Sequence, residues 1–229
     1  MDRRCHRSHP EIDLTTTSTN PIPHPKLPKP QNRTVTHSFP CDVDATAARI
    51  RSLWNQLANH LTHRIALDPK KHVDLIIAMS QDEMMFLMNA LWGEDDPTPR
   101  DNIPAFYDPH RHIVFDATQF SPRLSDEGHL SNLAHECHHA MRNQSLHLSL
   151  ISRLSTGCGE HAQEIETLIR AWGGWQDHEE DEIRCYSQNP MEVEAICFSH
   201  AIVPIPDDRL SQLVKEILAP IDLHMNIPR

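Results

Sequence analysis

Residues 135–139 read His-Glu-Cys-His-His and contain the pattern H-E-x-x-H. Positions four apart on a helix lie above one another on the same face, so His135 and His139 can both direct an imidazole nitrogen at one metal ion. Glu136 lies beside this pair, where its carboxylate can take a proton from water that the metal activates. These residues predict a metal centre with a general base.

The motif could also arise by chance, because 18 of the 229 residues are His. Its surroundings favour a real helix, since Asp126 is available as an N-cap and neither Gly nor Pro occurs in residues 129–150. Apolar residues recur at helical spacing through the motif: Leu130, Leu133, Ala134, Cys137 and Ala140. The pattern therefore predicts a buried helix that carries the two histidines.

A catalytic zinc site needs three protein ligands and one open position, so a third ligand must come from elsewhere in the chain. The segment at residues 189–195 is the best candidate. Pro190 suits the first turn of a helix, and Glu192 would then lie near the start of that helix, facing the motif. Glu194 is about 200° round the helix from Glu192, so both cannot bind the same ion. Glu192 is the expected third ligand.

These features resemble the zincin metallopeptidases of the gluzincin type, in which a glutamate from a later helix joins the H-E-x-x-H helix. Residues 192–198 read Glu-Val-Glu-Ala-Ile-Cys-Phe and look like the E-x-x-A-x-x-F segment of compact gluzincins, whose first glutamate binds zinc. The resemblance covers residues 103–205, and in it residues 113–115 take the place of the family's active-site edge strand.

The chain departs from the family pattern at two points. Thermolysin-like members usually carry an aspartate four residues after the ligand glutamate, where it supports a histidine, but this chain has Ile196 there. Any support for the ligands must then come from other residues. The stretch between His139 and Glu192 is also longer than compact members need, which implies an inserted helix.

The resemblance implies a zinc-dependent peptidase with one Zn2+ per chain, bound by His135, His139 and Glu192, with Glu136 as general base. Its substrate would be a protein or peptide whose extended backbone adds alongside residues 113–115. Two alternatives stay open: a catalytically inactive zincin-like binding or sensing module, and a helical interaction protein whose motif is accidental. The intact Glu136 argues against a purely structural metal site, because such a site has no use for a base.

Three other residues near the predicted site have a plainer interpretation. His138 lies about 100° from His139 round the helix and cannot share its metal, so we expect it at the surface or supporting a ligand. Cys137 lies off the ligand face and is expected to be a packed thiol. Tyr186 is either a hydrogen-bond donor to an oxyanion or an ordinary packed tyrosine.

Composition narrows the classes of partner and compartment. The net charge is −11 and no block of Lys and Arg occurs, which argues against nucleic acid and anionic membranes as partners. No apolar run approaches the roughly 20 residues that span a bilayer. Six cysteines without a C-x-x-C pair favour reduced thiols in the cytoplasm over a disulfide framework.

Residues 1–42 are rich in Pro, Ser and Thr and lack apolar periodicity, so we expect a disordered tail followed by one domain at 43–229. The tail is either a plain extension or an address for export of a toxin or effector. A classical secretory signal is not expected, because no hydrophobic stretch follows the basic residues near the start.

The fold class expected for residues 43–229 is α+β: a mostly helical, zincin-like domain with a small antiparallel sheet or hairpin beside the motif helix. Residues 148–154 either extend the motif helix or begin another, and Gly157 and Gly159 are expected to break the chain. Other helices are expected over residues 44–65, 80–92, 162–172, 191–202 and 210–218, and strands over 73–79, 105–107 and 112–116.

Overall fold

The structure is a computed structural model of the chain and describes residues 42–92, 105–108, 110–118, 125–171 and 180–225. The helices and strands below belong to one compact unit, Ser38–Arg229. The tail predicted over residues 1–42 lies outside the described residues, apart from Asp42, which caps the first helix.

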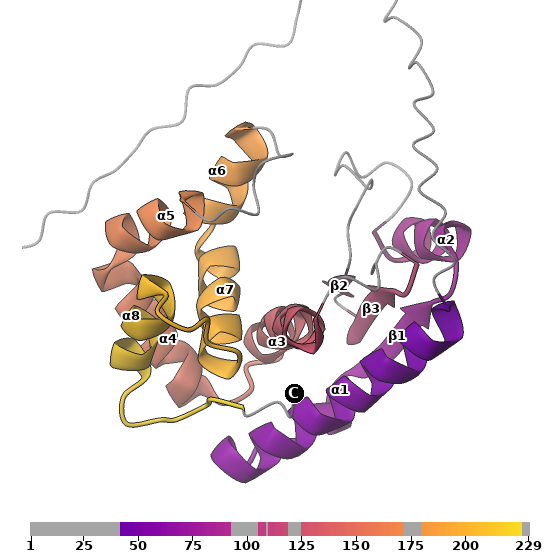
Figure 1. Cartoon of the computed structure of the whole chain (residues 1–229), viewed down its shortest axis with the longest axis horizontal. Coiled ribbons are helices and arrows are strands. Elements are labelled where there is room, and N and C mark those ends of the chain that lie inside the picture. The colour runs from indigo at the N-terminus through magenta and orange to yellow at the C-terminus, as the bar shows by residue number, and fades with distance from the viewer. Residues whose placement is uncertain (1–41, 93–104, 109, 119–124, 172–179, 226–229) are drawn as a thin grey trace, which may run out of the picture. The chain divides into compact units, whose positions relative to one another are not determined.

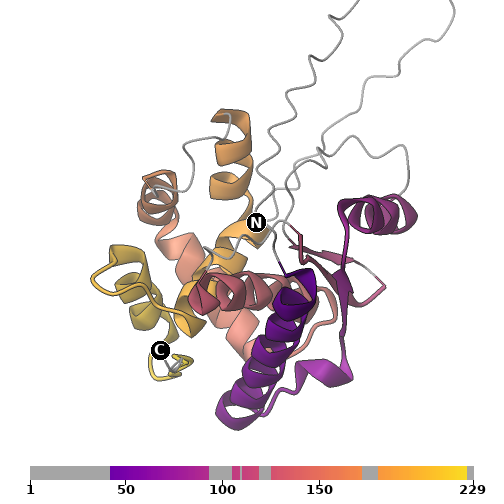
Figure 2. The same ribbon diagram turned by 45° about the vertical axis from the view of Figure 1, so that its right-hand side comes forward.

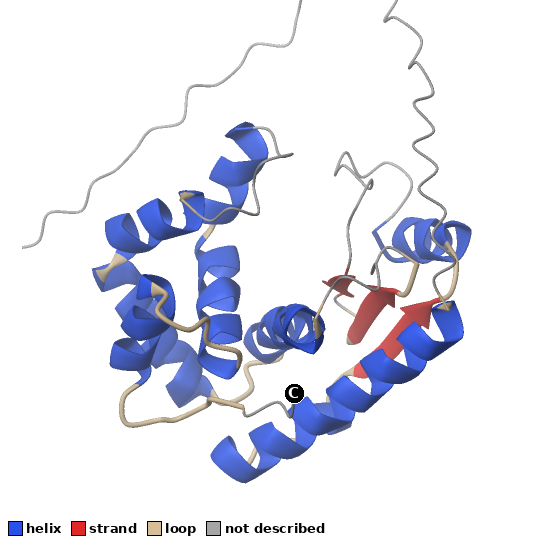
Figure 3. Ribbon diagram, viewed as in Figure 1, coloured by secondary structure: helices blue, strands red, loops and turns tan. Residues whose placement is uncertain are grey.

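The described residues are mostly helical with one small sheet, which confirms the predicted α+β class (Figure 3). The helices are α1 (Val43–Ile65), a short 3-10 helix η1 (Pro69–Lys71), α2 (Gln81–Trp92), α3 (Asp126–Asn143), α4 (Leu148–Glu160), α5 (Ala162–Arg170), α6 (Glu180–Gln188), α7 (Pro190–Ile202) and α8 (Arg209–Leu218). The strands are β1 (Asp74–Ala78), β2 (Ala105–Asp108) and β3 (His112–Asp116).

The sheet has the order β1-β3-β2 and is mixed rather than purely antiparallel. The predicted hairpin is present, because β2 pairs antiparallel with β3, but β1 joins the other side of β3 in parallel. Residues 113–115 therefore lie in the central strand and have a neighbour on both sides. Their expected place as an edge strand is wrong, and β2 is the edge strand nearer to α3.

Side chains alternate between the two faces of the sheet, as the pleat of a strand requires. Along β3, Ile113 and Phe115 enter the main core with α1 and α3, while Val114 enters a smaller cluster with Met84 and Met88 of α2. Figures 1 and 2 show the same arrangement, with α3 on one side of the strands and α2 on the other. The sheet is thus covered on both faces, and α3 lies on the face of the main core.

The helices of the C-terminal half pack in succession on α3. α7 packs against α3, and α4 and α8 pack against α7 (Figure 1). The long stretch between His139 and Glu192 contains α4, α5 and α6, in keeping with the inserted helix implied by the sequence. This arrangement brings the start of α7 back to the middle of α3.

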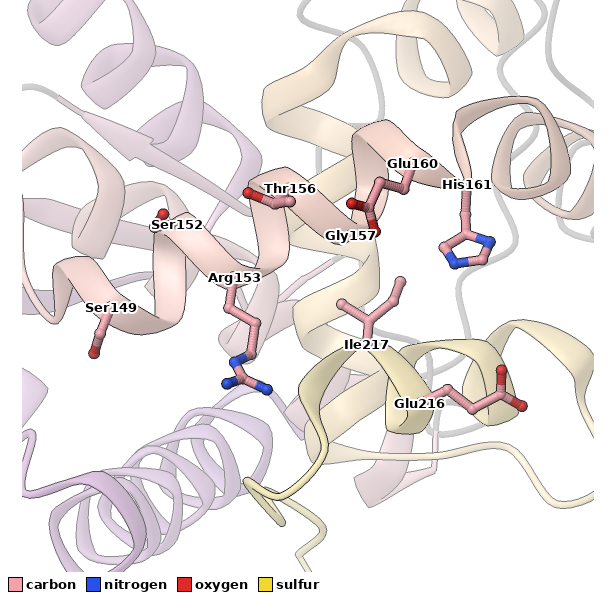
Figure 4. Close-up of a pocket in the computed structure, with 9 residues that line it drawn as sticks. All are labelled: Ser149, Ser152, Arg153, Thr156, Gly157, Glu160, His161, Glu216 and Ile217. Carbon is pink, nitrogen blue, oxygen red and sulfur yellow. The ribbon is translucent and has the colours of Figure 1, made fainter.

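Gly157 and Gly159 do not break the chain, because both lie inside α4. A Cβ atom at Gly157 would lie 2.3 Å from Ile217 Cγ2 on α8, whereas one at Gly159 would meet nothing within 4 Å. Figure 4 shows the Ile217 side chain directed at Gly157. Gly157 is therefore needed where α4 and α8 approach each other, and it does not end the helix.

Candidate metal centre

The helix that carries the motif is α3, and its apolar stripe is buried as predicted. Its N-cap is Ser125, whose hydroxyl accepts a hydrogen bond from the Gly128 N–H at 3.3 Å. The cap predicted at Asp126 is wrong by one residue. Asp126 instead forms an ion pair with Arg49 of α1, which joins the start of α3 to that helix.

Three donor atoms from α3 and α7 meet at one point. His135 Nε2 lies 3.1 Å from Glu192 Oε2, and His139 Nε2 lies 3.0 Å from His135 Nε2 and 3.5 Å from Glu192 Oε2. Ligand atoms about 2.0–2.1 Å from a tetrahedral zinc ion lie roughly 3.3 Å from one another. The spacing therefore suits one small cation, and these three residues are near enough to hold a metal ion.

The site combines burial with access to solvent. The side chains of His135, His139 and Glu192 are 18%, 13% and 21% exposed. Two imidazoles and one carboxylate form a donor set found in catalytic zinc sites, where the remaining position takes water or substrate. Within the described residues, the group thus supplies three donors for one metal ion.

Glu192 is placed by the start of α7. The Asn189 side chain caps this helix by accepting a hydrogen bond from the Met191 N–H at 3.0 Å, and Pro190 occupies the first turn as predicted. Glu192 follows in the same turn, where the positive end of the helix dipole favours a carboxylate. The local sequence therefore fixes where α7 begins and which of its residues faces the histidines.

The electrostatics of the cluster keep the carboxylate charged. Burial alone would raise the pKa of Glu192, but hydrogen bonds with His135 and His139 outweigh it and lower the pKa well below the ordinary value. Burial would lower the pKa of His139, and the hydrogen bond with Glu192 overcomes this and raises it. Glu192 is thus ready to ligate a cation over the whole neutral range.

Glu136 is buried beside the two histidines, with 8% of its surface exposed. Burial is the main cause that raises its pKa above the ordinary value, while His135 and His139 act in the opposite direction. The main-chain N–H of Tyr107 on β2 acts in the same direction as the histidines and favours the charged form of the carboxyl group. A carboxylate with a raised pKa next to a candidate metal centre is suited to proton transfer.

Glu194 does not take part in the three-residue cluster, as its position round the helix predicted. It is buried, with 2% exposed, and its carboxylate accepts from the Arg142 guanidinium on α3. His138 is fully buried, so the surface alternative is wrong, and its Nε2 lies 3.7 Å from Glu194 Oε2. Burial lowers the pKa of His138 to about 3, which keeps the ring neutral.

Arg142 is the residue near the centre that the sequence did not single out. It follows His139 by three positions and therefore lies close to the stripe of α3 that carries the ligands. The sequence signal that could have identified Arg142 is a charged residue on that stripe of the helix, together with a second glutamate, Glu194, close to Glu192 in the chain. Cys137 is buried as expected, and burial raises the pKa of its thiol to about 12.

Two other features are not part of the three-residue cluster. Tyr186 is on α6 with 38% of its surface exposed, and its contribution to an oxyanion site stays a prediction. A cavity of about 510 Å³ between α4 and α8 is lined by polar side chains such as Thr156, Glu160 and Glu216 (Figure 4). None of the residues that line this cavity belongs to the candidate metal centre.

No protein-family model, curated protein or solved structure matches this chain. The gluzincin resemblance therefore depends on the cluster and on the helices that hold it. Within the described part of the chain, no helix combines the length and apolar character that crossing a membrane requires.

Proposed function

We propose that this protein is a zinc-dependent metallopeptidase of the gluzincin type. The observation that carries the proposal is the convergence of His135, His139 and Glu192 at ligand spacing, with the buried carboxylate of Glu136 beside them. Zinc held by these three residues would supply Lewis acidity toward water and toward a peptide carbonyl oxygen. The elements that hold these residues are far apart in the sequence, which makes a chance meeting a poor explanation.

The proposed work of Glu136 is proton transfer. Its carboxylate accepts a proton from the attacking water and returns it to the leaving amine nitrogen as the peptide bond breaks. The raised pKa brings the carboxyl group closer to neutral pH, although a divalent cation at the cluster would lower it again. The Tyr107 main-chain amide also favours the charged form of this carboxyl group.

The expected substrate is an extended segment of a protein or peptide, and the strand that receives it is β2 rather than residues 113–115. In an antiparallel strand the N–H and C=O of one residue point to the same side. Asp108 bonds within the hairpin turn, so the preceding residue of β2, Tyr107, has its N–H and C=O on the outer edge of the strand. A peptide that adds to this edge passes beside the general base.

Metal analysis of the purified chain tests the first part of the proposal. We expect one zinc per chain in the wild type, and loss of zinc in His135→Ala. His63→Ala is the matched control, since His63 is exposed on α1 and lies outside the cluster. If the wild-type chain binds no divalent metal after loading with zinc, the proposal is wrong. The chain is then better explained as a helical interaction protein whose motif is accidental.

A proteolysis assay tests the second part. We expect the zinc-loaded wild type to cleave an unfolded protein such as denatured casein or members of a peptide library. Glu136→Gln should retain zinc and lose activity by about 100-fold or more, because general base catalysis contributes on that order. A Glu136→Gln variant of undiminished rate removes Glu136 from this role, and zinc binding without any hydrolysis favours the inactive binding module.

We propose a reducing compartment for the protein, either the host cytoplasm or the cytoplasm of a target cell reached as an exported effector. Among the described cysteines, Cys137, Cys158 and Cys197 are buried and free, which supports reduced thiols. Fractionation of the source cells and their medium, with detection of the tagged chain, separates the two locations.

A further inference from the structure

α7 is joined to α3 at two points near its start. At the first, Glu192 meets the two histidines, and at the second, two residues later, Glu194 meets Arg142. The two glutamates lie about 200° apart round the helix, so they reach different parts of α3. Rotation or sliding of α7 on α3 would disturb both contacts together.

The second contact is unusual because it buries charge. Glu194 is 2% exposed, while the Arg142 side chain is 34% exposed and carries its guanidinium in to the carboxylate. Ion pairs of this kind add little net stability, since removing the charges from water costs about as much as their attraction returns. Their geometry is nevertheless well defined, because a guanidinium meets a carboxylate in a planar, directional contact.

The metal centre has one degree of freedom that α3 cannot set. The spacing of His135 and His139 is fixed within one helix, whereas the position of Glu192 depends on how α7 lies against α3. A functional site must be held within about 0.5 Å of its working geometry, which calls for a directional contact close to the ligand. The ion pair of Arg142 and Glu194 meets this need, since it is directional and adjoins both ligand-bearing segments.

We propose that Arg142 and Glu194 are positioning residues of the metal centre, whose ion pair sets α7 against α3 so that Glu192 reaches the ligand position. This inference rests on the metal-binding part of the proposed function and does not depend on peptidase activity. Thermolysin-like members of the family usually have a supporting aspartate at the position of Ile196. In this chain, Arg142 and Glu194 would support the metal centre in its place.

The test measures the affinity of the full chain for zinc by competition with a chromophoric chelator. We expect Glu194→Gln and Arg142→Gln each to weaken zinc binding 10- to 100-fold, the range typical of residues that support ligands. The double variant should lose no more zinc affinity than the single variant that binds zinc more weakly, because both changes break the same contact. Cobalt-substituted variants should show altered intensity in the visible d–d bands, which report the geometry of the ligands.

Two controls separate positioning from general stability. Arg209→Gln breaks exposed ion pairs with Glu164 and Glu216 away from the site, and should leave zinc affinity within about twofold. Leu213→Ala removes a buried side chain of α8 and should lower the melting temperature without changing zinc affinity or the cobalt spectrum.

The proposal is overturned if Glu194→Gln and Arg142→Gln bind zinc within twofold of the wild type and give its cobalt spectrum. It is also overturned if Leu213→Ala weakens zinc binding as much as they do. Where Glu194→Gln does not fold, Arg142→Gln and Arg142→Lys test the same contact from its more exposed side. A wild-type chain that binds no zinc is a different result, because it contradicts the proposed function itself.

Discussion

The main-chain N–H of Tyr107, on the outer strand of the sheet, favours the charged form of Glu136, the residue beside His135 and His139. The Tyr107 hydroxyl donates to Asn143 Oδ1 at 3.2 Å and accepts from Gln144 Nε2 at 3.4 Å. These two hydrogen bonds join β2 to the C-terminal end of α3.

Tyr107→Phe removes the hydroxyl and keeps the main-chain amide. We expect the free energy of unfolding to fall by about 1 kcal/mol, the usual net value of a lost hydrogen bond. Zinc content should not change, because the variant keeps the main-chain amide and the three residues of the cluster. Urea denaturation and metal analysis of the same sample check both statements, and a variant that loses zinc would show that the hydroxyl acts on the metal centre.

Glu192→Ala removes the proposed third ligand. Loss of a residue that merely supports a ligand costs 10- to 100-fold in metal affinity, so loss of the ligand itself should weaken zinc binding more than about 100-fold. Chelator competition measures the change. Zinc affinity equal to that of the wild type would exclude Glu192 from the centre and point to another acidic ligand.

Zinc should stabilise the folded chain, since the proposed site exists only when α3 and α7 are in their native arrangement. At a free zinc concentration 100 times the dissociation constant, the gain is about 2.7 kcal/mol, which corresponds to a rise in melting temperature of about 5–10 °C. Differential scanning fluorimetry with zinc and with EDTA measures this shift. His135→Ala should abolish it and His63→Ala should retain it; equal shifts in both variants would place the bound zinc elsewhere.

Acid should destabilise the protein through its buried histidines. Burial is the main cause that lowers the pKa of His200, whose Nδ1 lies 3.0 Å from Ser211 Oγ and 3.4 Å from Asp208 Oδ2. The unfolded chain binds a proton near pH 6.5 and the folded chain only at lower pH. This contribution to stability is therefore fully present above pH 6.5 and is lost as the pH falls below it.

The slope of stability against pH tests the role of His200. One such histidine adds at most about 1.4 kcal/mol per pH unit. Urea denaturation between pH 7.5 and 5 should show a smaller slope for His200→Asn than for the wild type, and an unchanged slope for the exposed His63→Asn. Equal slopes in all three proteins would assign the acid sensitivity to other groups.

The two glycines of α4 should respond in opposite ways to alanine. Gly157→Ala should destabilise the protein by about 1–3 kcal/mol, because the added methyl group overlaps the Ile217 side chain. Gly159→Ala has open space and should stabilise the helix by about 0.5–1 kcal/mol. Ile217→Ala should restore part of the loss in Gly157→Ala; failure of this rescue would show that the close approach of α4 and α8 is not the cause.

The parts of the site that could be predicted depend on local rules. His135, Glu136 and His139 share one helix, so their spacing alone sets their relative places. Glu192 could be predicted because Pro190 marks the first turn of α7 and so fixes which residue comes next. The apolar periodicity of α3 indicated the buried face for the same reason.

The parts that could not be predicted depend on contacts between distant segments. Residues 113–115 read as a strand, but nothing in them shows that β1 pairs on their far side and leaves β2 at the edge. Gly157 followed the usual pattern of a helix stop, and only the approach of α8 explains why it lies inside α4. The contact of Arg142 with Glu194 likewise requires the crossing of α3 and α7.

The order of the ligands along the chain has one more consequence. A cation bound by α3 and α7 is a cross-link that closes the loop formed by α4, α5 and α6, and such closure restricts the unfolded chain more than the folded one. In the metal-free protein, the contact between α3 and the start of α7 should therefore open first. The three intervening helices should then become accessible to proteases together. A metal bound at the proposed site would then protect these helices from proteolysis.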